Sequence, residues 1–247
     1  MNAEIEKLTH ILKESHNIVF FGGAGVSTAS GIPDFRSGDG LYNIVENRRY
    51  SPEEMLSHSF FYSHTKEFYD FYKEKMIYTN VRPNGAHIAL AKLEEMGKLK
   101  AVITQNIDGL HQAAGSKKVF ELHGSVHRNY CTGCNTFYDL NFILNSDGIP
   151  RCPSCNGIVK PDVVLYEEAL DSDTLTNSIR AIHAADTLII GGTSLVVYPA
   201  ASLIDYFNGK NLVLINKSST SRDSKANLVI NDSIDEALSD ATHSLIK

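Results

Sequence analysis

Residues 22–36 read GGAGVSTASGIPDFR and follow a short apolar run, IVFF at 18–21, that predicts a buried strand. A strand that runs into a glycine-rich turn brings the backbone close to a pyrophosphate, because glycine lacks a Cβ and tolerates positive φ. The hydroxyl residues after the glycines are expected to cap a following helix, whose N-terminal amides favour an anion. The pattern departs from GxGxxG, so by itself it fits an ordinary glycine-rich loop equally well.

The end of this stretch places three chemically different side chains behind a rigid turn. Pro33 stiffens the chain and pushes the preceding residue out of helical geometry. Asp34, Phe35 and Arg36 then offer a carboxylate, an aromatic face and a guanidinium. Such a set suits the orientation of a sugar, the covering of a ring and the binding of a phosphate.

Apolar runs alternate with helical patterns along the rest of the chain. Strands are predicted at 18–21, 100–104, 119–122, 163–166, 187–190, 212–215 and 228–230, and helices at 3–15, 86–96, 171–185, 199–207 and from 234 onward. Polar or glycine residues follow most of these strands, as in an open parallel α/β sheet whose ligands bind beyond the carboxyl ends of its strands. The pattern therefore predicts the α/β class with a parallel sheet.

Composition and charge set the broad class of protein. The 247 residues are 43% hydrophobic and 21% charged, and the formal net charge is −6. This balance is ordinary for a globular protein, argues against general nucleic-acid binding and favours cationic partners such as lysine-bearing peptides. No apolar run approaches the length of a membrane span and no signal-peptide core is present, so we expect a cytoplasmic protein that does not bind membranes.

Four cysteines form two close pairs in the middle of the chain. Cys131 and Cys134 are separated by two residues, as are Cys152 and Cys155, and 17 residues lie between the pairs. This spacing is typical of a closed zinc site with four thiolate ligands, which holds structure and leaves no open position for catalysis. A nucleic-acid-binding ribbon is the alternative, but the segment between the outer cysteines has one basic residue against two acidic ones.

Polar residues that end the predicted strands are the candidates for a site. The sequence QNID at 105–108 follows one strand, His123-Gly124 follows another, and GTS at 192–194 and Asn216 follow two more. A histidine at such a position has a pKa near neutrality and suits acid–base work. From the residues alone, turn-forming Asn and Asp side chains remain an equal alternative for 105–108.

Taken together and in this order, these motifs resemble the sirtuins, a family of NAD-dependent protein deacylases, over roughly residues 18–235. The resemblance implies a Rossmann-like NAD-binding sheet with an inserted zinc-binding module in one catalytic domain, 1–247. Its large part would comprise 1–40, 85–125 and 160–247, and its small modules a helical segment, 41–84, and a zinc ribbon, 126–159. NAD would be the co-substrate, one structural Zn²⁺ would be bound, and the partners would be acyl-lysine proteins or peptides.

Residue roles also follow from the resemblance. His123 would act as general base on the NAD ribose, with Asn106 and Asp108 beside it as further catalytic residues. The other expected NAD contacts are Gly23, Ala24, Gly25, Thr28, Asp34, Phe35, Arg36, Gln105, Ile107, Gly192, Thr193, Ser194, Asn216 and Ile234. The expected substrate contacts are Val163, Val164, Tyr166, Tyr69 and Tyr72, with the peptide added as a strand beside 163–168. The products would be free lysine, nicotinamide and O-acyl-ADP-ribose.

Three positions depart from the family's usual pattern. Gly22 stands where the family usually has Thr, and Glu167 stands where it often has Gly. Members that remove succinyl or malonyl groups carry Tyr-x-x-Arg, whereas the matching residues here are Tyr69 and Tyr72. Because a buried carboxylate needs a cationic partner, we predict that neutral acyl groups, acetyl above all, are preferred.

Two other functions fit the same NAD site. One is a mono-ADP-ribosyltransferase, and the other is a zinc-containing NAD sensor without catalysis. His123 favours deacylation over ADP-ribose transfer, and Asn106, Asp108 and His123 together argue against a sensor. The dense aromatic set at 60–72 is interpreted as core packing, with the wall of a substrate channel as the alternative.

Overall fold

A six-stranded parallel sheet forms the larger half of the molecule, within the residues that the computed structural model describes: 2–35, 40 and 49–246. In the order β3-β2-β1-β7-β8-β9, its strands are β3 (Val119–Glu121), β2 (Leu99–Thr104), β1 (Ile18–Gly22), β7 (Thr187–Gly191), β8 (Asn211–Ile215) and β9 (Leu228–Ile230). Each lies where a strand was predicted, so the predicted α/β class is confirmed. All five residues of β1 are buried, which is why that strand is a continuous apolar run.

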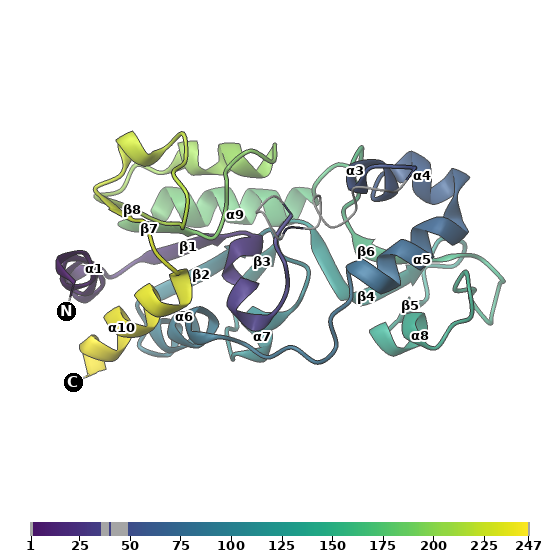
Figure 1. Ribbon diagram of the computed structural model, residues 1–247, viewed down its shortest axis with the longest axis horizontal. Helices are drawn as coiled ribbons and strands as arrows, with labels where there is room; N and C mark the ends of the chain where they lie inside the picture. Colours follow the sequence, from purple (N-terminus) through teal and green to yellow (C-terminus); the bar gives the residue numbers. More distant parts are fainter. Residues whose placement is uncertain (1, 36–39, 41–48, 247) are drawn as a thin grey trace.

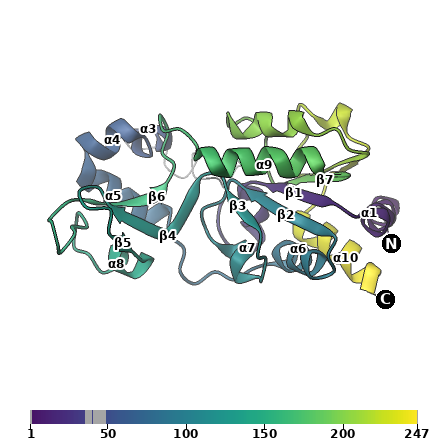
Figure 2. The ribbon, with the colours of Figure 1, turned by 180° about the vertical axis from the view of Figure 1, so that it is seen from behind.

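Helices cover both faces of this sheet (Figures 1 and 2). One face carries α1 (Ala3–Glu14), α6 (Gly85–Glu95) and α10 (Ile234–Ile246), and the other carries α9 (Ser172–Ala184) and the 3-10 helix η3 (Ala200–Tyr206). The alternation of side chains along β1 explains the two layers. Phe20 packs on the side of α1, α6 and α10, whereas Val19 and Phe21 pack on the side of α9.

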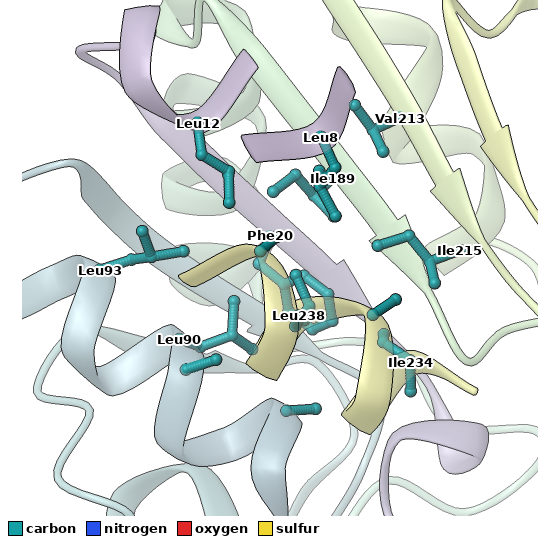
Figure 3. Packing of buried hydrophobic residues seen from close by; sticks show 14 of the residues in the cluster. Leu8, Leu12, Phe20, Leu90, Leu93, Ile189, Val213, Ile215, Ile234 and Leu238 are labelled. Atoms are coloured by element: carbon teal, nitrogen blue, oxygen red, sulfur yellow. The ribbon is translucent and has the colours of Figure 1, made fainter. Parts of the chain in front are cut away.

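Figure 3 shows the first of these cores from close by. Leu8 and Leu12 from α1, Leu90 and Leu93 from α6, and Leu238 from α10 meet around Phe20 of β1. Each of these six side chains is fully buried. The helices therefore fix the sheet by apolar contact, and the carboxyl ends of its strands gain a rigid base.

The small half combines a short antiparallel sheet with helices. Its strands, in the order β5-β4-β6, are β5 (Phe137–Tyr138), β4 (Gly124–Cys131) and β6 (Val159–Val163). The helices are α3 (Pro52–Met55), α4 (His58–Ser63), α5 (Thr65–Lys75) and α8 (Leu140–Leu144), while the short α7 (Leu110–Ala113) belongs to the large half. Phe61, Phe68 and Phe71 are fully buried among them, so the interpretation of the aromatic set as core packing is confirmed for these residues.

Two predicted elements differ from the structure. The strand predicted at 163–166 is displaced, because β6 ends at Val163 and Tyr166 forms only an isolated bridge with Ser57. The ladder stops there since the Leu165 N–H donates to the Glu168 side chain, 2.9 Å away, instead of to a strand. The helix predicted at 199–207 is a 3-10 helix, η3, in the structure.

Our division of the chain at 41–84 and 126–159 stays a prediction. Throughout the described part of the chain, every helix is too short or too polar to cross a membrane.

Candidate active site

A cleft of about 980 Å³ lies between the two halves, at the carboxyl ends of β1, β2, β7 and β8. Its lining includes most of the residues that the sequence singled out: Gly23, Ala24, Gly25, Thr28, Asp34, Phe35, Gln105, Asn106, Ile107, Asp108, His123, Val163, Val164, Tyr166, Gly192, Thr193, Ser194, Asn216 and Ile234. Their segments are far apart in the chain. They meet because parallel strands present their carboxyl ends at one edge of a sheet.

Two glycine turns interlock at the floor of the cleft. The Gly25 N–H donates to the Gly192 carbonyl at 2.8 Å, and a Cβ on Gly25 would lie 2.8 Å from the Gly192 Cα. Gly192 has a φ of 60°, and a Cβ there would lie 2.4 Å from the backbone nitrogen of Val26. Only glycine fits at these two positions, because any side chain there would push apart the turns after β1 and β7.

The expectation of a capped helix after the first glycine turn was wrong. The chain instead forms two 3-10 turns, η1 (Ala24–Val26) and η2 (Thr28–Ser30), and neither has a side-chain cap. Thr28 Oγ1 donates back to the Gly25 carbonyl at 3.0 Å. Gly31 then leaves the second turn with a φ of 90°, which ends the helical geometry after one turn.

A hydrogen-bonded triplet of side chains joins the first two strand ends. Ser27 Oγ donates to Asp108 Oδ2 at 2.6 Å and accepts from Asn106 Nδ2 at 3.1 Å. The second carboxylate oxygen of Asp108 accepts from the Leu110 N–H at 2.9 Å, which fixes the carboxylate at the start of α7. Ser27 was missing from our predicted site residues, although its place in the glycine-rich stretch was a usable signal.

A second chain of hydrogen bonds links the strand ends on the other side of the floor. Gln105 Nε2 donates to Thr193 Oγ1 at 3.1 Å, and the Thr193 N–H donates to Asn216 Oδ1 at 2.9 Å. Asn216 Nδ2 is buried and has no hydrogen-bond partner among the described residues. An unpaired donor in a cleft wall is costly unless a ligand uses it, so Asn216 is a candidate ligand contact.

His123 occupies the centre of the cleft wall with one nitrogen committed. Its Nδ1 lies 3.0 Å from the Gln105 carbonyl oxygen, a contact that needs the proton on Nδ1 and leaves Nε2 as an acceptor. Burial lowers the pKa of His123, and the bond to Gln105 only partly opposes that effect. The imidazole is therefore neutral near pH 7, as a general base requires.

Two predicted residues are not brought into this cleft, and the position of a third is not described. Arg36 lies outside the described residues. Tyr69 and Tyr72 are fully buried in the small half and are absent from the cleft lining; Tyr69 donates to the Val159 carbonyl. Sequence reasoning also missed several lining residues, namely Leu56, Lys75, Met76, Tyr78, Val126, Lys217, Ser218 and Ser219. Of these, Lys217 to Ser219 had a signal, since they directly follow β8.

The four cysteines converge in the small half. None forms a disulfide, and their sulfur atoms all lie within 4.8 Å of one another. Cys131 Sγ is 3.3 Å from Cys155 Sγ, and Cys134 Sγ is 3.6 Å from Cys152 Sγ. Four sulfurs around one Zn²⁺ at about 2.3 Å would stand roughly 3.8 Å apart, so the cluster fits a closed tetrahedral zinc site.

Comparison with known proteins identifies the family. A model of the Sir2 family matches residues 23–199. A protein of Clostridium perfringens named NAD-dependent protein deacetylase is 69% identical over 239 residues, which cover 96% of this chain and 98% of that protein. The chain belongs to the Sir2 family. The predicted family and the predicted enzyme class, an NAD-dependent protein deacetylase, are thereby confirmed.

Solved Sir2 structures share the whole fold. One, described as a Sir2 variant with a deacetylated p53 peptide and 3′-O-acetyl ADP ribose, has a TM-score of 0.89 and 41% identity, over 97% of this chain and 98% of that one. Another, described as Sir2 with a p53 peptide and NAD⁺, has a TM-score of 0.85 and 42% identity over the same shares. The fold of these Sir2 structures thus extends over 97% of this chain.

Proposed function

We propose that the cleft binds NAD and an acyl-lysine peptide together, and that the enzyme transfers the acyl group to the ADP-ribose part of NAD. The observation that carries this proposal is the convergence of His123, Asn106, Asp108 and the two glycine turns on one cleft. The products are free lysine, nicotinamide and O-acetyl-ADP-ribose. The ligands of the two solved Sir2 structures, a peptide with NAD⁺ or with acetyl ADP ribose, support the same assignment.

The floor of the cleft provides the NAD site in this proposal. The backbones after β1 and β7, at 23–25 and 192–194, approach the pyrophosphate, and Asn216 and Ile234 lie toward the adenosine. Thr28, Asp34 and Phe35 stand on the ribose side, where Phe35 covers the reacting ring. Arg36 lies outside the described residues, and its contact with NAD stays a prediction. Gln105 to Asp108 face the nicotinamide end, where Ser27 holds the Asn106 and Asp108 side chains in register.

His123 supplies the acid–base chemistry. The acyl oxygen of the substrate attacks C1′ of the nicotinamide ribose, and nicotinamide leaves with the bonding electrons. The free Nε2 of His123 then takes a proton from a ribose hydroxyl, which attacks the acyl carbon, and the lysine leaves as an amine that has taken up a proton. Water then adds to the remaining cyclic acyl-ribose cation and gives O-acetyl-ADP-ribose. The bond from Nδ1 to Gln105 keeps the ring in the tautomer that can accept this proton.

The small half contributes the substrate side. A peptide strand alongside 163–168 would place the acyl-lysine near Val163, Val164 and Tyr166, which line the cleft. We keep the preference for neutral acyl groups as a proposal, because the lining here is largely apolar, with Leu56, Met76 and Val126. Tyr69 and Tyr72 support this pocket indirectly, because they belong to the same buried core as Leu56 and Val126.

The remaining assignments concern the setting of the enzyme. Cys131, Cys134, Cys152 and Cys155 would hold one structural Zn²⁺, which ties β4 to the end of the ribbon and takes no part in the reaction. We propose a cytoplasmic location, with acyl-lysine proteins as partners and no direct binding to nucleic acid.

Mass spectrometry of one acetyl-lysine peptide tests the function. The peptide is incubated with the protein, with and without NAD, and both peptide and nucleotide products are measured. We expect loss of the acetyl mass only with NAD, together with O-acetyl-ADP-ribose. An unchanged peptide with ADP-ribose mass added to protein would instead establish the mono-ADP-ribosyltransferase.

A further inference from the structure

The loop at 164–168 carries a side chain at a point where the backbone favours glycine. Glu167 has a φ of 76°, in the left-handed region that side chains rarely adopt. Tyr166, Glu167 and Glu168 all line the cleft, so the shape of this loop shapes the substrate side. Something must hold Glu167 in this conformation.

Helix α4 provides that hold through its first turn. The Ser59 N–H and Ser59 Oγ both donate to the Glu167 carboxylate, each at 2.9 Å and each to a different oxygen. The His58 N–H donates to the Tyr166 carbonyl at 3.0 Å. The first N–H groups of a helix have no partner inside it, so the loop satisfies two donors that α4 would otherwise leave unpaired.

The residues on either side of Glu167 are anchored as well. The Tyr166 N–H donates to the Leu56 carbonyl at 2.9 Å. The Glu168 carboxylate contacts His58 Nδ1 at 2.9 Å and Lys160 Nζ at 3.1 Å. The start of α4 and the loop at 164–168 are thus joined at three successive loop residues. Figures 1 and 2 both show α3 and α4 beside the end of β6.

The backbone of Glu167 differs from that of its neighbours. Tyr166 uses its N–H on Leu56 and its carbonyl on His58, the first residue of α4. The N–H and carbonyl of Glu167 have no hydrogen-bond partner within residues 2–35, 40 and 49–246. A peptide added as a strand needs such unpaired main-chain groups, and their direction depends on the dihedral angles of this one residue.

We propose that Glu167 is a positioning residue for the acyl-lysine peptide. The hydrogen bonds between its carboxylate and Ser59 keep the Glu167 backbone in the orientation that pairs with the peptide. The inference rests on the proposed function of the cleft. The side chain acts through Ser59 and not as a charge that selects basic peptides, because both carboxylate oxygens are already engaged.

Three substitutions of Glu167 separate this role from the alternatives. Glu167→Ala removes the carboxylate but keeps the unfavourable φ, so the KM for the peptide should rise about tenfold, the worth of one charge-assisted hydrogen bond. Glu167→Gly removes the same contact and accepts the positive φ, so the rise should be smaller, about threefold. Glu167→Gln can still bond to Ser59 and should stay within about twofold of the parent.

The partner residue gives an independent variant. Ser59→Ala removes only the hydroxyl contact and should raise the peptide KM by a few-fold, and the double variant Ser59→Ala/Glu167→Ala should be no worse than Glu167→Ala alone. In every variant the KM for NAD and the kcat should stay near the parent values. Glu54→Ala is the matched control, since the Glu54 carboxylate accepts from the Ser51 N–H at the start of the nearby α3 and has no hydrogen bond to the loop among the described residues.

The measurements are steady-state deacetylation of one basic and one neutral acetyl-lysine peptide, with melting temperatures for each variant. An unchanged peptide KM in folded Glu167→Ala, or an equal rise in Glu54→Ala, would overturn the positioning role. A loss in Glu167→Gln confined to the basic peptide would assign Glu167 to direct charge recognition instead. If Glu167→Ala does not fold, the peptide KM of Ser59→Ala tests the positioning role in its place. Absence of NAD-dependent deacetylation in the parent protein would defeat the proposed function itself, before any variant is compared.

Discussion

The two halves that face each other across the cleft are held together by different means. The large half is a sheet between two helical layers, and its central strand β1 is buried along its whole length. In the small half, β5 has two residues, β4 ends at Cys131, and β6 begins at Val159, after the last cysteine. Both halves have a buried apolar core, but the ribbon of the small half depends in addition on its four thiols.

In our proposal, this difference corresponds to separate tasks for the two walls. The sheet gives the nucleotide side fixed backbone turns and side chains bound to one another. The small half carries the substrate loop and joins it to α4 by side-chain contacts. A disturbance of the ribbon should therefore harm the substrate wall first, while the nucleotide wall survives it.

Removal of the metal should have the largest effect, and this effect should fall on the small half. A structural zinc contributes about 10–16 kcal/mol of binding free energy, so a chelator should unfold the ribbon at 124–163 and abolish deacetylation. We expect protease cleavage confined to this segment, with the helical circular dichroism of the large half retained. Ser154→Ala, in a knuckle but not a ligand, should resist the chelator as well as the parent does. Uniform unfolding of both halves would contradict the proposed independence.

His123→Ala should have the next largest effect, on the chemistry alone. Loss of a general base costs about 10²–10⁴-fold in rate, so kcat should fall by that factor. The dissociation constant of NAD, measured by calorimetry, should change little because the turns of the sheet hold the nucleotide. His183→Ala, an exposed histidine on α9, is the control and should keep full activity. Retained turnover in His123→Ala would remove this residue from the mechanism.

Acid should weaken the large half through a buried histidine. His111 lies behind the cleft floor with its ring 4.7 Å from that of His87, and burial lowers its pKa to about 3. Because the unfolded chain binds this proton near pH 6.5, stability is full above that pH and declines as the pH falls toward 3. At pH 4.5 the loss is roughly 2–3 kcal/mol.

The check is urea unfolding of the parent and of His111→Met between pH 7 and 4.5. Substitution by an apolar residue of similar size should flatten the dependence on pH, whereas His10→Ala, on the exposed side of α1, should leave it unchanged. The same slope in His111→Met and in the parent would show that other groups control acid stability.

The acyl preference is the prediction with the smallest expected effect, and it concerns the substrate wall. We expect acetyl to be removed at least about tenfold faster than succinyl from the same peptide, since a buried carboxylate without a cation is costly. Lys75 is a cation in the cleft lining, and it pairs with Glu74 at 3.0 Å. Faster removal of succinyl that disappears in Lys75→Met would reverse our preference and name the responsible residue.

Much of this enzyme was determined by the sequence alone. The apolar runs, the glycines at 23, 25 and 192 and the cysteine spacing each act locally, through chain geometry or short-range coordination. That is why the parallel sheet, the family and the enzyme class were predicted correctly. The order of the strand ends along the chain also placed His123 among the candidates.

Tertiary structure decided what depends on contacts between distant segments. Ser27 meets Asp108 across 81 residues, and Glu167 meets Ser59 across 108. Tyr69 and Tyr72 were expected at the acyl pocket but are buried in the core, because helix α5 turns that face toward the ribbon. A one-dimensional pattern specifies which residues can bond or be buried. Only packing of the whole chain selects their partners, since burial makes each unpaired polar group costly.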